Sequence, residues 1–210
     1  MSKAYKWLGG IGYILTFVPY ANFVASILTA IAWILMGRDT RERIFTIFGA
    51  ITLVLFAGSL AFVAYLLTMM FAIPTSPPYE PRSFLTPFLG VAMVILGLAL
   101  ASYVLEILAH FKAAKIFDNK WFKIAGWLRI GLIIAAVISI PLALSFIASS
   151  IPHIISGSTM PTLFPVIASI LWPIAIVAII GIFAIIFSVI AFFTIPDQPR
   201  SKNVYIFEME

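Results

Sequence analysis

Three side chains within one apolar stretch have the chemistry to relay a proton or hold a small ion. Glu106 and His110 are four residues apart and Tyr103 lies about one turn before Glu106, so in a helix all three share a face. An ionisable residue inside a membrane span marks a functional site by default. Depth favours a plainer interpretation, because Glu106 lies eighteen residues past Phe88, about 27 Å along a helix and near the membrane boundary. We therefore expect Glu106 and His110 to form an interfacial pair with Lys112 nearby.

A second group of side chains is basic and interleaved with aromatic residues. Residues 111–129 carry lysines at helical spacing opposite an apolar side, a pattern typical of a helix that lies among lipid headgroups. An anionic headgroup or the acidic surface of a partner would be bound by Lys112, Lys115, Lys120, Lys123 and Arg129. Two alternatives stay open at this point. The segment could be a plain cytoplasmic loop that obeys the positive-inside rule, and Asp118-Asn119 could break it into two pieces.

The elements that position these residues must lie in a membrane. Hydrophobic residues make up 63% of the 210 residues and charged residues 10%, against about 45–50% and about 25% in soluble domains. Cysteine is absent, which excludes disulfides and thiol catalysis, and no metalloprotease, hydrolase or phosphate-loop motif occurs. Glycines 9, 10 and 12 fit close helix packing better than a phosphate loop. We therefore expect no enzymatic activity, no cofactor, no metal and no nucleic-acid partner.

The predicted fold class is all-α, a single domain built as a polytopic bundle of transmembrane helices. Lipid cannot satisfy backbone hydrogen bonds, so long apolar runs in it must be helical. Four runs are long enough to cross a hydrocarbon core of about 30 Å, namely residues 44–73, 88–110, 130–148 and 166–193. Residues 111–129 would be a basic interfacial segment, His153 would lie in an outer Ser/Pro-rich loop, and residues 197–210 would form a cytoplasmic tail.

The first apolar block, residues 7–36, allows two structures because Pro19 interrupts it. It is either one kinked span or a hairpin of two short helices, neither long enough to cross the core, with a polar apex at Tyr20 and Asn22. As one span it leaves three of the 13 Lys and Arg residues on one side and ten on the other; as a hairpin it leaves one and twelve, because Lys3 and Lys6 change sides. The positive-inside rule favours the hairpin, with both termini in the cytoplasm of a multi-pass protein of the cell membrane.

Three short stretches resemble one known family. They are Leu8-Gly9-Gly10-Ile11-Gly12, the segment Phe122-Lys123-Ile124-Ala125-Gly126 that follows an apolar helix and a charged stretch, and the ending Ile190-Ala191-Phe192-Phe193-Thr194-Ile195-Pro196. In this pattern the chain is similar to a mainly archaeal group of integral membrane proteins called domain of unknown function 996. The resemblance implies a polytopic, archaeal membrane protein and brings no activity and no functional residues.

Two classes of function fit these observations. The favoured hypothesis is a non-catalytic accessory or scaffold subunit of a membrane complex, or a protein that organises lipid, with membrane lipids and a membrane-protein partner or a second copy as its contacts. The alternative is a small transporter or channel, acting as one chain or assembled from several copies. Its pathway would be lined by Tyr20, Asn22, Glu106 and His110.

Overall fold

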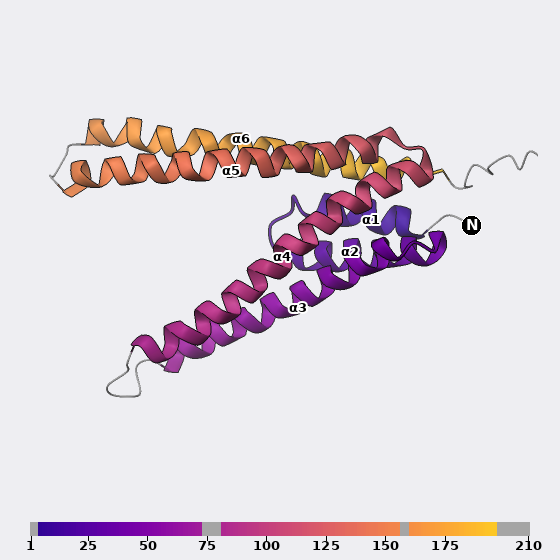
Figure 1. Cartoon of the computed structure of the whole chain (residues 1–210), viewed down its shortest axis with the longest axis horizontal. Coiled ribbons are helices and arrows are strands. Elements are labelled where there is room, and N and C mark those ends of the chain that lie inside the picture. The colour runs from indigo at the N-terminus through magenta and orange to yellow at the C-terminus, as the bar shows by residue number, and fades with distance from the viewer. Residues whose placement is uncertain (1–3, 73–80, 156–159, 197–210) are drawn as a thin grey trace, which may run out of the picture.

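Six helices make up the part of the chain that the structure describes (Figure 1). The structure is a computed structural model, and it describes residues 4–72, 81–155 and 160–196. The helices are α1 (Ala4–Leu15), α2 (Asn22–Thr40), α3 (Arg43–Ala72), α4 (Pro81–Phe117), α5 (Lys120–Ile155) and α6 (Met160–Phe193). No strand occurs in these residues, and the five helices α2 to α6 are long and apolar enough to cross a membrane. The predicted all-α bundle of membrane helices is confirmed.

The helices close into a ring at one end of the molecule. Each helix packs on the next in sequence, and α1 packs on α6, which closes the ring. Figure 1 shows α3/α4 and α5/α6 as two long hairpins whose far ends diverge, with the shorter α1/α2 hairpin between them. We call the closed end the basic end and define it by the turns at residues 41–42 and 118–119. The tail at residues 197–210 lies outside the described residues.

The first apolar block forms the hairpin alternative. The helix is interrupted between Leu15 and Asn22, around Pro19, and Tyr20 adopts a left-handed backbone conformation with φ 67°. One expectation needs correction, because α2 runs to Thr40 and its 19 residues reach about 28 Å. It is therefore long enough to cross the core, and it ends where Arg41 turns left-handed with φ 57°.

Three of the predicted spans are longer than the sequence suggested, and one of them is α6, which begins at Met160 instead of at residue 166. Helix α4 begins at Pro81, a residue that is tolerated in the first turn of a helix. Helix α5 continues to Ile155, so His153 belongs to that helix and not to a loop. Residues 111–129 do not form a separate interfacial segment. They are the end of α4 and the start of α5, separated by a turn at Asp118, whose φ is 48°.

Asn119 holds this turn in place. Its Oδ1 accepts a hydrogen bond of 3.0 Å from the backbone N–H of Trp121, which caps the start of α5. Its Nδ2 donates to the carbonyl oxygen of Ala191 at 3.0 Å and to Thr194 Oγ1 at 3.1 Å. The α4–α5 turn is thereby fastened to the end of α6.

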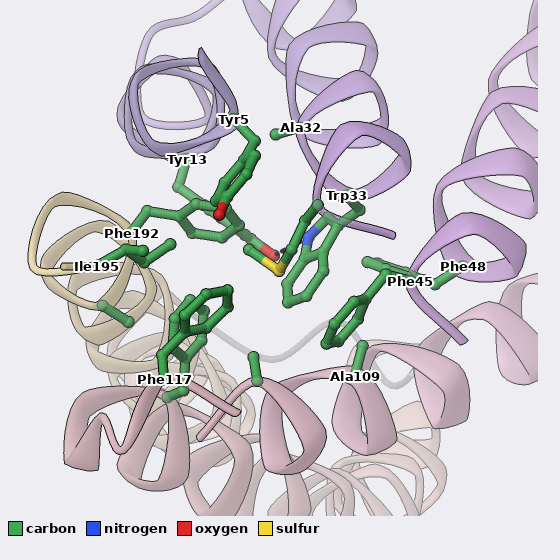
Figure 2. Packing of buried hydrophobic residues seen from close by; sticks show 14 residues of the cluster. Tyr5, Tyr13, Ala32, Trp33, Phe45, Phe48, Ala109, Phe117, Phe192 and Ile195 are labelled. Carbon is green, nitrogen blue, oxygen red and sulfur yellow. Dashed lines mark hydrogen bonds between the residues drawn. The ribbon is translucent and has the colours of Figure 1, made fainter. Parts of the chain in front are cut away.

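Trp33 lies at the centre of the core (Figure 2). It is fully buried, and its ring centroid lies 5.2 Å from Phe192, 5.4 Å from Phe45 and 6.1 Å from Phe122. All six helices contribute to this cluster, which lies near the basic end. In the diverging ends, side chains such as Val137 are about two-thirds exposed at 65%, as expected where lipid is the solvent.

Glycines of α1 allow close packing on α2, as predicted for the hairpin, and also on α6. A Cβ on Gly9 would overlap the ring of Phe192, and a Cβ on Gly12 would lie 2.5 Å from Thr29 Oγ1 and 2.9 Å from the Thr29 backbone nitrogen. Gly97 of α4 differs, because a Cβ there would meet nothing within 4 Å.

We expect Gly12→Ala to lower the thermal unfolding temperature of the detergent-solubilised protein. The backbone of α2 must move to admit the methyl group, and overpacking of this kind costs about 1–3 kcal/mol. Gly97→Ala is the matched control and should be neutral or slightly stabilising, because alanine favours a helix. Equal unfolding temperatures for the two variants would contradict this account of the hairpin.

Candidate functional site

Side chains from five helices meet in one polar network within the core at the basic end. Its members are Tyr13 of α1, Trp33 of α2, Tyr103, Glu106 and His110 of α4, Arg129 of α5, and Ser188 of α6.

The centre of this network is an ion pair between α4 and α5. Arg129 Nη2 lies 2.6 Å from Glu106 Oε1, and the two side chains are only 5% and 17% exposed. Glu106 Oε1 also accepts a hydrogen bond of 2.8 Å from the Tyr13 hydroxyl, to which Trp33 Nε1 donates at 3.4 Å. The guanidinium carbon of Arg129 lies 5.6 Å from the centroid of the Tyr13 ring, a favourable cation–π contact.

His110 joins α4 to α6 through this network. Its Nδ1 lies 2.8 Å from the backbone carbonyl oxygen of Glu106, which can only accept, so Nδ1 carries the proton. Its Nε2 lies 3.2 Å from Ser188 Oγ, and the same oxygen accepts a hydrogen bond of 2.9 Å from Arg129 Nη1. The ring is fully buried and lies 5.1 Å from that of Trp33.

The network is largely buried, and its buried nitrogen and oxygen atoms each lie within hydrogen-bond distance of a partner. Among the residues that the structure describes, no buried side-chain nitrogen or oxygen lacks a hydrogen-bond partner. Satisfied groups of this kind hold a single arrangement of the helices around them. The geometry therefore indicates a structural role, in which the network holds five helices together.

The structure corrects two expectations about this group. Glu106 and His110 lie one turn apart and join one network, in which His110 is fully buried and the Glu106 side chain is 17% exposed. The partner of Glu106 is Arg129, whereas Lys112 pairs with Glu42 at 3.0 Å. Arg129 is 4% exposed and is held by Glu106, so it does not take part in a headgroup site.

The four predicted lysines come together around the α4–α5 turn. They line an open groove of about 760 Å³, which we call the lysine groove, formed by Ile44, Leu108, Phe111, Lys112, Ala114, Lys115, Asp118, Asn119, Lys120 and Lys123. The acidic groups nearby are Asp118 in the lining and Glu42, which pairs with Lys112. The Nζ atom of Lys120 lies 5.0 Å from the ring centroid of Trp121. The groove combines a cationic part with an apolar part.

A further contact ties the start of α1 to the end of α2. The Tyr5 hydroxyl donates a hydrogen bond of 2.9 Å to Asp39 Oδ2. Burial first, and then the hydrogen bond to Asp39 and its charge, raise the pKa of the Tyr5 phenol above its ordinary value. The phenol therefore stays protonated at neutral pH and remains a donor.

The structure does not bring the predicted pathway residues together. Tyr20 is 92% exposed at the tip of the hairpin. Asn22 is exposed as well and lines a small groove between α2 and α3 whose polar members include Ser26 and Thr52. Glu106 and His110 instead contact core residues near the basic end, Glu106 through Tyr13 and His110 through Trp33.

Sequence reasoning missed Tyr13, Trp33 and Ser188. Their contacts to the ion pair and to His110 cross between helices far apart in the chain, such as Tyr13 to Glu106 and His110 to Ser188. No local spacing signals such pairs. The one available signal was that Gly9 and Gly12 frame a tightly packed helix face, which places Tyr13 next to a neighbouring helix.

The fold and the burial pattern define a multi-pass helical membrane protein with a charged network in its core. Among the described residues, no three His, Cys, Asp or Glu side chains gather in a way that would hold a metal ion. No family model, no curated protein and no solved structure matches the chain. The resemblance to domain of unknown function 996 stays a prediction.

We expect Arg129→Met to destabilise the protein strongly, because it leaves Glu106 charged and unpaired in the core. Loss of one partner of a buried pair costs about 3–5 kcal/mol. The double variant Glu106→Leu/Arg129→Met removes both charges and should recover much of that loss. Thermal unfolding in detergent measures both. Losses that simply add, with no recovery in the double variant, would disprove the coupling.

Proposed function

We propose that this chain is a non-catalytic multi-pass membrane protein that binds anionic lipid headgroups in the lysine groove. The observation that carries the proposal is the lining of that groove, in which four lysines adjoin an apolar wall that includes Ile44, Leu108 and Phe111. A phosphate would meet cations there, and the hydrocarbon attached to it would meet apolar side chains. Basic groups at the membrane surface attract anionic lipid at roughly 1 kcal/mol each.

The depth of the groove supports the proposal. Lys112 and Lys123 are six and five residues from Asp118, so both lie within about 9 Å of the turn along their helices. Trp7 and Trp127 are 52% and 58% exposed, and exposed tryptophans gather at the headgroup level of membranes. These exposed tryptophans support a position of the lysines near the lipid phosphates.

The proposal includes an orientation with the basic end in the cytoplasm. Arg38, Arg41 and Arg43 are exposed at the α2–α3 turn, and the four lysines surround the α4–α5 turn. Both turns lie at the end where α1 begins and α6 ends, as the contacts Tyr5–Asp39 and Asn119–Thr194 require. The positive-inside rule then assigns that end to the cytoplasm.

We expect the double variant Lys115→Gln/Lys123→Gln to bind phosphatidylglycerol about 10- to 30-fold more weakly than the wild type, given about 1 kcal/mol for each lysine. Native mass spectrometry of the detergent-solubilised protein measures the affinity, with phosphatidylcholine as the neutral comparison. Arg38→Gln/Arg43→Gln removes the same charge at the same end but outside the groove, and should change the affinity little. Equal losses in the two double variants would refute a localised site.

The orientation predicts that both termini are shielded in intact cells. The natural chain has no cysteine, so single cysteines report position directly. We expect Ser2→Cys and Ser201→Cys to resist a membrane-impermeant thiol reagent until the cells are opened, whereas Ser76→Cys should react at once. Labelling of Ser2→Cys from outside would contradict the orientation.

A further inference from the structure

A second groove lies between α3 and α4, farther from the basic end. It has a volume of about 600 Å³ and an apolar lining formed by Val54, Leu55, Gly58, Ala61, Phe62, Tyr65, Gly90, Val91, Val94, Ile95 and Leu98. Two glycines keep part of this space open, because a Cβ on Gly58 or Gly90 would meet nothing within 4 Å. The groove is a slot with hydrocarbon walls.

Helical register places this slot in line with the lysine groove. Eighteen residues make five full turns of an α-helix, so residues eighteen apart lie on the same side. Ile44 of the lysine groove is eighteen residues from Phe62 of the slot, both on α3. On α4, Lys112 stands in the same relation to Val94, and Leu108 to Gly90. One side of α3 thus lines both grooves, and so does one side of α4.

The stretch between the grooves is apolar and accessible. Ile51 lies on that side of α3, and Ala101 and Leu105 lie on that side of α4. Ala101 is exposed, and the other two side chains are partly exposed. A hydrocarbon chain that leaves the lysine groove can therefore follow the α3–α4 seam to the slot.

The separation of the two grooves sets the length of that chain. From Lys112 to Val94 the rise along α4 is about 27 Å, whereas one leaflet supplies about 15 Å of hydrocarbon. A chain confined to one leaflet ends before the middle of the slot. An extended chain advances about 1.2 Å per bond, as the extended polypeptide does, so the distance requires more than about twenty bonds.

We infer that the two grooves are the ends of one binding track for a long, single-chain anionic lipid of the polyprenyl phosphate class. The phosphate binds the lysines, and the chain follows the seam between α3 and α4 into the slot beside Gly58 and Gly90. The inference rests on the proposed headgroup function and adds the length of the chain.

Two ligands with the same headgroup test the track, namely undecaprenyl phosphate, which has a long chain, and farnesyl phosphate, which has a short one. Native mass spectrometry in detergent gives the affinity for each. We expect the wild type to prefer the long chain by at least about tenfold, because only the long chain reaches the slot and gains van der Waals contacts with its fixed walls. Gly58→Leu and Gly90→Leu place a side chain in the slot at positions where a Cβ meets nothing within 4 Å, and they should abolish this preference while leaving farnesyl phosphate binding unchanged. Gly131→Leu, another open glycine but on α5 and outside both grooves, should keep it.

The outcomes separate the inference from the function on which it rests. Equal affinity of the wild type for both phosphates, or a preference that survives in both slot variants, overturns the track. If Lys115→Gln/Lys123→Gln still weakens both ligands in that case, the headgroup function stands. If neither phosphate binds, or if the lysine variant binds as well as the wild type, both proposals are wrong. Unchanged unfolding temperatures confirm that the slot variants are folded.

Discussion

The charge pair between Glu106 and Arg129 governs how the basic end is built. A lone charge in a low-dielectric interior is costly, and even a pair needs further hydrogen bonds to offset its desolvation. Here the Tyr13 hydroxyl donates a hydrogen bond to the Glu106 carboxylate, and Ser188 Oγ accepts one from the Arg129 guanidinium. Those side chains belong to α1 and α6, which close the ring of helices. The requirement to satisfy two charges thus explains why a short hairpin is held between the longer ones.

The same requirement divides the basic residues of the α4–α5 hairpin into two classes. Arg129 lies far enough from the turn to be buried. Its guanidinium donates hydrogen bonds to Glu106, to Ser188 and to the carbonyl oxygen of Ala125. The lysines lie closer to the turn and line an open groove, and flexible stems such as theirs can keep a charged end outside an apolar region. Depth along the helix therefore decides which cations hold the fold together and which remain available to a ligand.

Much of the fold could be predicted, because apolar runs of this length have no stable alternative to helices in lipid. The ion pair between Glu106 and Arg129 could have been predicted as well. Residues 106 and 129, 112 and 123, and 115 and 120 are symmetric about a point between residues 117 and 118, so a turn at Asp118 brings each pair level across an antiparallel hairpin. The sequence does not show that a turn forms at Asp118, because the turn depends on hydrogen bonds from Asn119 to the end of α6. Tyr13 and Ser188 depend on closure of the whole ring, and no local pattern encodes it.

In a membrane protein a lipid is both solvent and ligand, so a lipid site needs a feature that bulk lipid cannot match. An apolar slot alone offers no selectivity, because lipid tails are as apolar as its walls. Lysines alone select charge, and any anionic headgroup satisfies them. A fixed cationic groove aligned with a slot about 27 Å away along α4 imposes a length as well as a charge. The continuous helix α4 fixes that distance, and the Glu106–Arg129 pair joins α5, with its lysines, to α4.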